Sequence, residues 1–415
     1  MRVTDFILQN TYLMNLNANK NEVNRIQQQI VTQRKINKPS DSPLGSARLL
    51  RYSNQLNDID TYLKSSDYAS SFMDRTITAL QSIRDIVVNA QTDFVKMGDP
   101  LSEDSLPVYA DKVDFYLKSI IDLANSEYDG KSLFGGTEIT SKPFSIDSST
   151  SQVSVNNWNI SGEQRIRISK STEQQINIPG DELFLSVLKN TGNFDVNAAV
   201  GANTTLTNTV YDSSGNVYDV TVTYTKTSAN NYTMDYSITD SGSVVVDSGS
   251  HTLAFDAATG NLSALDGGTP SKIHIEINSP QIRMLIDPTE LTEANKTAGI
   301  SQSQNMKGDV FNTLAAIKDG LKNGQAPNEN QVEIVNDFGT QILNKSSEAG
   351  NYYNRISNNT EQLQNEETEL NKLVSGERDT DVAQAIMDLQ NRQYALELSY
   401  KVSAMILPHS LLDYL

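Results

Sequence analysis

The sequence TDVAQAIMDLQNRQYALELSYKVSAMILPHSLLDYL, residues 380–415, repeats large apolar residues at the alternating spacing of four and three that is typical of a coiled-coil helix. This seam consists of Val382, Ile386, Leu389, Leu396, Tyr400 and Leu407, with Gln393 and Ser403 in the two gaps. A single helix cannot bury such a seam by itself. Each large side chain gains about 1.5–3 kcal/mol on burial, so the seam represents on the order of 10 kcal/mol that only a partner can realise.

A second amphipathic helix is predicted at the other end of the chain. Its apolar residues follow the same spacing, and they are Phe6, Leu13, Leu16, Val23 and Ile30. We therefore expect the two ends of the chain to pair with each other.

Composition limits the classes of function. The chain has 415 residues and a net charge of -18, which argues against nucleic acid or an anionic membrane as the main partner. There is no cysteine, either by chance or because the chain crosses redox compartments unfolded. The start of the chain lacks a secretory signal and no apolar run predicts a membrane span. We expect a cytosolic protein, or one that leaves by a route that reads no cleavable signal.

The stretch INKPSDSPLGSARLL, from Ile36, predicts the end of one helix and the start of another. A proline disfavours helix at the residue before it, and a serine followed by proline is a good helix start. This helix-start motif consists of Pro39, Ser40, Asp41, Ser42 and Pro43. Apolar spacing then continues to Phe94 and predicts a rod of about 78 Å, which indicates a structural protein rather than a compact enzyme.

The middle of the chain changes from helical to strand periodicity. A shorter helix is predicted over residues 103–127, and from Pro143 to Ile277 apolar residues alternate with polar ones between turn signals. This pattern predicts an inserted antiparallel β domain, with one short helix over residues 181–189. Alternating pairs such as Val244 and Val246 are expected to face its core.

Helical periodicity returns after the β domain, from Gly308 to Leu321 and then over residues 328–374. Two rods of matched length should lie antiparallel in one bundle. The predicted fold class is α+β, a long antiparallel helical bundle or coiled coil built from both chain ends with an inserted antiparallel β domain. The expected domains are a terminal assembly helix (1–38), the two halves of the rod (39–140 and 286–376), the β domain (141–285) and the second terminal assembly helix (377–415).

No pattern of reactive residues indicates catalysis, a cofactor or a metal. His251, His274 and His409 lack ligand spacing. Asp212 begins a segment similar to the start of a calcium loop, but the glycine and terminal glutamate of that motif are missing, so a hairpin turn is the better interpretation. We predict a protein that is not an enzyme.

Three motifs carry a family resemblance: INKPSDSPLGSARLL, LFGGT from Leu133, and the ending SLLDYL from Ser410. With them, the chain resembles the flagellin superfamily of bacterial flagellar axial proteins, and within it the hook-associated protein 3 (FlgL-type) family of the hook–filament junction. The stretch GDVFNTLAAIKDG, from Gly308, is similar to the core helix of the family's return leg. The segment from Asn208 to Gly242 resembles the β module of flagellar hook proteins. One departure is Pro408, which should kink or end the last helix near Leu407.

The resemblance implies a structural adaptor that joins the hook-associated ring to the first flagellin subunits. It implies type III export, a place outside the cell in the flagellum, a cytoplasmic chaperone on the C-terminal helix, and self-association in a ring. The assembly interface would then comprise both seams together with Leu411, Leu412, Tyr414 and Leu415. A flagellin filament subunit, and a surface adhesin that uses the β domain, remain alternatives.

Overall fold

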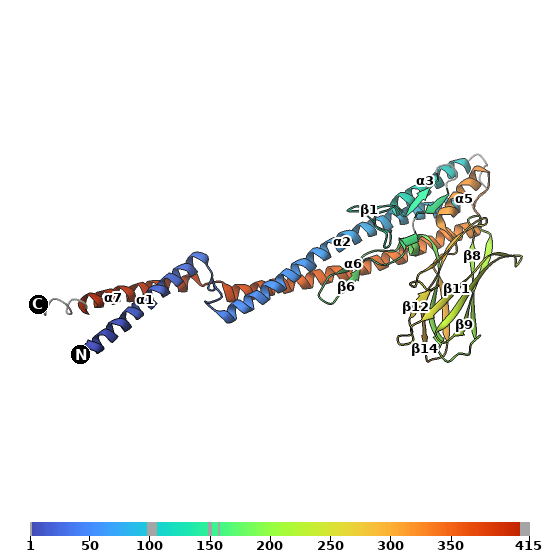
Figure 1. Ribbon diagram of the computed structural model, residues 1–415. Helices are drawn as coiled ribbons and strands as arrows, with labels where there is room; N and C mark the ends of the chain where they lie inside the picture. The colour runs from blue at the N-terminus through green and yellow to red at the C-terminus, as the bar shows by residue number, and fades with distance from the viewer. Residues whose placement is uncertain (1, 98–105, 148–151, 157, 407–415) are drawn as a thin grey trace. The chain divides into compact units, whose positions relative to one another are not determined.

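The computed structural model describes residues 2–97, 106–147, 152–156 and 158–406. The chain divides into two compact units, a terminal unit of residues 1–65 and 358–415 and a central unit of residues 66–357. The α-helices are α1 (Arg2–Thr32), α2 (Pro43–Met97), α3 (Leu106–Ala124), α4 (Gly180–Phe184), α5 (Val310–Lys322), α6 (Glu329–Arg378) and α7 (Val382–Ile406). The α+β class is confirmed, with helical chain ends around an inserted β domain (Figure 1).

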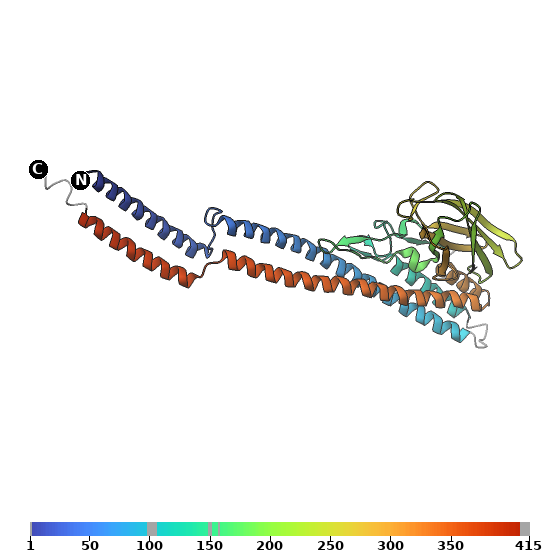
Figure 2. The same cartoon turned by 90° about the horizontal axis from the view of Figure 1, so that it is seen from below.

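The terminal unit is helical. Helices α1 and α7 lie side by side and run in opposite directions (Figures 1 and 2). The first turns of α2 pack against the last turns of α6 through Ile59, Leu363 and Leu370. Helix α2 begins at Pro43, the predicted position, and α6 ends at Arg378, four residues beyond the predicted end at residue 374.

In the central unit, α2, α3, α5 and α6 share one hydrophobic core. Phe72, Leu117, Phe311 and Phe338 are among its fully buried residues. Short hairpins cover this helical body between α3 and α4: β1 (Glu127–Tyr128), β2 (Lys131–Ser132), β3 (Phe144–Ile146), β4 (Val153–Val155), β5 (Arg165–Arg167) and β6 (Glu173–Gln175), with the 3-10 helix η2 (Trp158–Ile160). The long apolar periodicity of the sequence is therefore explained by burial along one bundle.

The outer β domain, residues 186–304, consists of two sheets. The strands are β7 (Ser186–Asp195), β8 (Asn203–Tyr211), β9 (Val217–Ser228), β10 (Asn231–Asp240), β11 (Val245–Phe255), β12 (Leu262–Leu265), β13 (Ile273–Asn278), β14 (Gln281–Ala294) and β15 (Gly299–Gln304). One sheet has the order β12-β11-β10-β9-β8 and the other β13-β14-β7-β15. Alternate residues of both sheets, including Tyr224, Met234 and Met284, form a second core.

Four details differ from the sequence-based expectations. The predicted helix over 181–189 ends at Phe184, and strand β7 follows it. Strand β14 crosses residue 285 and β15 ends at Gln304, so the β segment extends past the expected boundary. The domain is not wholly antiparallel, because β7 and β14 pair in parallel. Val244 lies in a hairpin turn and is exposed instead of facing the core.

The chain enters and leaves the outer β domain at adjacent points. The Ser186 hydroxyl donates to the Met306 carbonyl at 2.7 Å, and the Val187 N–H donates to Asn305 Oδ1 at 2.7 Å. Both ends of the insertion are thereby held at one place on the helical body.

Candidate assembly surfaces and the contacts that position them

The α1–α7 pair brings together the first and the last helix of the described residues. Val23, Ile26 and Ala385 are buried in it, and Val382, Leu389 and Leu396 are partly buried. Tyr12 donates its hydroxyl to the Ser399 carbonyl, and Arg392 Nη1 lies 3.4 Å from Asn19 Oδ1. These contacts fix the antiparallel register of the two helices.

The two connectors that lead out of this pair are tied to each other. The α1–α2 connector and the α6–α7 connector form one isolated antiparallel bridge with each other, between Arg34 and Asp379. The Lys35 N–H donates to the Arg378 carbonyl at 2.6 Å, and the Thr380 N–H donates to the Gln33 carbonyl at 3.0 Å. Gln33 has a φ of +56°, a left-handed conformation that turns the chain here. A bend at one connector must therefore be accompanied by a bend at the other.

The predicted helix-start motif shapes the first connector. One carboxylate oxygen of Asp41 accepts the N–H groups of Lys38 and Asn37, at 2.8 and 3.0 Å, and these bonds hold the pKa of Asp41 below its usual value. The Ser42 hydroxyl accepts the Gly45 N–H at 3.1 Å and caps α2. Pro39, Ser40 and Pro43 are exposed, so the prolines act on the backbone rather than through packing.

The structure divides the predicted interface residues whose burial it describes between two environments. Leu16, Val23, Ile30, Val382, Leu389 and Leu396 are buried or partly buried within the chain. Leu13, Ile386 and Tyr400 are exposed. Phe6 lies in α1, and Leu407, Pro408, His409, Leu411, Leu412, Tyr414 and Leu415 lie outside the described residues.

Sequence reasoning missed a further set of exposed apolar residues on α7. Met387, Tyr394, Leu398 and Val402 are all exposed and were not part of the predicted seam. Their spacing of seven, four and four could have shown them, since such residues share one helix face.

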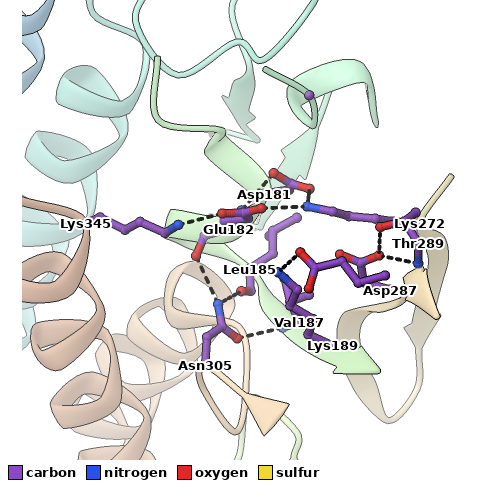
Figure 3. A network of polar contacts seen from close by, with 12 residues as sticks. Asp181, Glu182, Leu185, Val187, Lys189, Lys272, Asp287, Thr289, Asn305 and Lys345 are labelled. Atoms are coloured by element: carbon purple, nitrogen blue, oxygen red, sulfur yellow. Dashed lines mark hydrogen bonds and ion pairs between the residues drawn. The ribbon is translucent and has the colours of Figure 1, made fainter. Parts of the chain in front are cut away.

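In the central unit, a network of polar contacts joins the outer β domain to α6 (Figure 3). Lys272, just before β13, reaches Asp181 at 2.7 Å and Glu182 at 3.2 Å, and Lys345 of α6 reaches Glu182 at 2.5 Å. Burial opposes ionisation, but the two lysines outweigh it and lower the pKa of Glu182 to about 2. The Asn305 side-chain amide donates to the carbonyls of Glu182 and Leu185. The outer domain is thus held on the helices by charges as well as by packing.

A second buried ion pair joins β14 to the start of α5. Arg283 Nη1 lies 3.1 Å from Asp309 Oδ2, and Arg283 also donates to the Val153 carbonyl at 2.5 Å. Asp309 accepts the Phe311 N–H at 3.0 Å and so caps α5. Burial raises the pKa of Asp309, and the nearby guanidinium opposes that rise.

No group of three or more potential ligands could hold a metal ion anywhere in the part of the chain that the structure describes. His251 bonds to Asp266 at 2.7 Å, and His274 stacks on Trp158 with ring centroids 4.4 Å apart. Across residues 2–97, 106–147, 152–156 and 158–406, none of the helices is both long and apolar enough to span a membrane.

Family models match three parts of the chain. The bacterial flagellin N-terminal helical region matches residues 3–138, and the bacterial flagellin C-terminal helical region matches residues 332–415. The D2 domain of flagellar basal body protein FlaE matches residues 177–367, which overlap the start of the C-terminal match. The two flagellin regions together cover more than half of the chain, and the chain belongs to the flagellin superfamily. The resemblance to flagellin-type ends that enclose a flagellar β module is confirmed.

Among solved structures, the chain is similar to FlgL of Xanthomonas campestris, at 15% identity and a TM-score of 0.46, covering 78% of this chain and 99% of that one. It is similar to the flagellar junction protein FlgL of Legionella pneumophila, at 15% identity and a TM-score of 0.45, covering 80% and 100%. It is also similar to a putative flagellar hook-associated protein of Vibrio parahaemolyticus, at 13% identity and a TM-score of 0.41, covering 82% and 100%. No curated protein matches the chain in sequence.

Proposed function

We propose that this chain is a structural adaptor of the bacterial flagellum that joins the hook-associated ring to the first flagellin subunits. The observation that carries the proposal is the order of its modules. Flagellin-type helical regions at both ends enclose a D2 domain of a flagellar basal body protein. One chain thus combines parts of the two kinds of polymer that a junction has to connect.

Two sequence motifs support the adaptor over its nearest alternative, a flagellin filament subunit. The stretch from Asn37 to Pro43 and the ending SLLDYL resemble the junction type, whereas flagellins usually lack the two prolines and end differently. A surface adhesin that uses the outer β domain is the alternative of another class.

The proposed role is mechanical and involves no catalysis. Helices α1 and α7 would bind neighbouring copies in a ring, the preceding hook-associated protein on one side and flagellin on the other. The chain would be exported unfolded and reside outside the cell at the hook–filament junction. A cytoplasmic export chaperone would hold the C-terminal helix before secretion. The exposed apolar residues of α1 and α7 support this role, because such surfaces mark interaction sites.

Deletion of the gene tests the proposal. The adaptor predicts cells whose hooks bear no filament and whose flagellin appears in the medium, as seen by electron microscopy and immunoblotting. Re-expression of the full chain should restore filaments. Normal filaments in the deletion strain would refute an adaptor role, and loss of secreted flagellin itself would favour the filament-subunit alternative.

A further inference from the structure

The polar network beside α4 brings one lysine against two neighbouring carboxyl groups (Figure 3). Lys272 Nζ lies 2.7 Å from Asp181 Oδ2 and 3.2 Å from Glu182 Oε1. The side chain of Asp181 is 1% exposed and that of Lys272 is 11% exposed, whereas that of Glu182 is 33% exposed. An amine, a buried carboxyl group and a second carboxylate that can accept a proton are therefore in direct contact.

The geometry of this contact suits the formation of an amide bond between two side chains. An amine nitrogen that touches a carboxyl oxygen is near the distance of about 3–3.5 Å from which it can attack the carbon. The Glu182 N–H donates to Asp181 Oδ1 at 2.8 Å, so the oxygen that gains charge during such an attack already has a donor. Because the fold holds both reacting groups in place, the entropy cost of bringing them together is met before the reaction begins.

The protonation states of the three groups allow the reaction. Burial raises the pKa of Asp181, which favours the neutral acid that an amine attacks more readily than a carboxylate. Burial opposes the ionisation of Glu182, but Lys272 and Lys345 lower its pKa to about 2, so it is ionised at neutral pH and can accept a proton. Burial favours the neutral amine of Lys272, but the carboxylates outweigh burial and raise its pKa, so we expect a slow reaction.

Burial also shifts the equilibrium toward the amide. In water, the hydration of an ammonium and a carboxylate favours the separate ions over the bond. A buried pair has lost most of that hydration, so this penalty on the amide is reduced. A cavity of about 210 Å³ borders Glu182 and Lys345 and has room for the water that the reaction releases.

We propose that Lys272 and Asp181 join in an amide bond after the chain folds, with Glu182 as the proton acceptor. Glu182 takes one proton from Nζ, the amine attacks Asp181 Cγ, and the Nζ–Cγ bond forms as the Cγ–Oδ2 bond breaks. Oδ2 leaves as water, with its own proton and a second one from Nζ. The proton on Glu182 passes to solvent and the third proton of Nζ remains on the amide, so no oxidant, reductant or other reactant is needed.

The bond acts as a covalent strap across the outer β domain. It closes a ring of chain from residue 181 to residue 272, which contains strands β7 to β12, and it ties the segment before β13 to α4. The chain has no cysteine, so a disulfide cannot provide such a link. The strap goes beyond the proposed adaptor role and does not depend on it.

Intact-mass spectrometry of the full chain tests the bond. Chain kept unfolded in urea should have the mass of its sequence, and after refolding and incubation we expect the mass to fall by one water molecule. Peptide mapping should place the loss in a branched peptide that joins Lys272 to Asp181. The buried pair of Lys226 and Glu293, 3.0 Å apart, is the control in the same digest. Its ammonium is otherwise held by backbone carbonyls, which cannot take a proton, so we expect this pair to stay unlinked.

Three variants separate the reaction from a structural role of the same residues. Lys272→Arg and Asp181→Ala should both keep the full sequence mass after folding. Glu182→Gln retains the two groups that join but loses the proton acceptor, so we expect the bond to form about a hundredfold more slowly. Circular dichroism shows whether each variant has folded.

The mass of the unsubstituted chain decides the proposal even where a variant fails to fold. A folded chain that keeps its full sequence mass, or a missing water that maps to other residues, would overturn the strap. So would the same mass loss in Lys272→Arg. A Glu182→Gln chain that reacts at the rate of the unsubstituted chain would overturn the role of Glu182. Failure of the adaptor role is seen separately, as normal filaments in the deletion strain.

Discussion

Replacement of Arg283 by methionine should strongly destabilise the central unit. Arg283 of β14 and Asp309 at the start of α5 are both buried, and their charged atoms lie 3.1 Å apart. Methionine fills similar volume but leaves the Asp309 carboxylate buried without its cation. Breaking a buried pair in this way costs about 3–5 kcal/mol. For a unit of this size that corresponds to a fall in Tm of about 6–10 °C.

The measurement is urea and thermal unfolding of the full chain, followed by circular dichroism. Asp309→Asn in the Arg283→Met background is the matched control, because asparagine still caps a helix but carries no charge. We expect the double variant to recover at least about half of the free energy of unfolding that the single variant loses.

The loss of stability in Arg283→Met should be smaller at low pH than at neutral pH. Burial raises the pKa of Asp309, and loss of Arg283 removes the charge that opposes this rise. A raised pKa in the folded state favours folding at low pH and disfavours it as pH rises through that pKa. The deficit of the single variant should therefore shrink as pH falls from 7 toward 4. A loss below about 1 kcal/mol at pH 7, or a double variant no more stable than the single one, would refute the reasoning.

Three further predictions concern other parts of the chain. Lys345→Met should lower the free energy of unfolding by about 1–2 kcal/mol at pH 7, a modest loss because Glu182 is partly exposed and solvent screens its charge. In urea titrations this loss should vanish as pH falls from about 5 toward about 2, the lowered pKa of Glu182. Gly192→Ala should destabilise the outer β domain by about 2–4 kcal/mol, since φ is +123° and a Cβ would lie 2.1 Å from a backbone oxygen; an unchanged Tm would contradict this. In the purified monomer, amide exchange should be faster in residues 1–35 and 380–415 than in the centre, and uniform protection would argue against folding on assembly.

The long helices could be predicted because their periodicity is local. Helix α2 begins at Pro43, where a serine cap and a proline mark the start, and apolar spacing continues to its end. Strands β9 and β10 were equally clear, since one face of each packs on the core and the other meets solvent. Patterns of this kind need no knowledge of distant contacts.

The structural features that the sequence did not predict depend on contacts between segments far apart in the chain. Residues 186–188 look like the continuation of a helix, but they form a strand because β14, about 100 residues later, pairs with them in parallel. The ion pair between Arg283 and Asp309 joins a strand to a helix cap and leaves no periodic signal.

The candidate interface was predicted in part. Alternating spacing found the seam that includes Leu389 and Leu396, and the same spacing in α1 predicted that the two chain ends pair, as they do in the structure. The seam with Tyr394 and Leu398 was masked by the first, because a helix with apolar residues on two faces loses a single clear period.

The hydrogen bond between Ser186 and the Met306 carbonyl has a consequence for engineering. It places Ser186, the first residue of the outer β domain, beside Met306, two residues after the last, so the chain enters and leaves this module at adjacent points. A foreign domain whose own ends lie equally close could be grafted there without stretching either helix. Cargo displayed in this way would leave the α1–α7 pair chemically unchanged, and the number of displayed copies would equal the number of chains in the assembly.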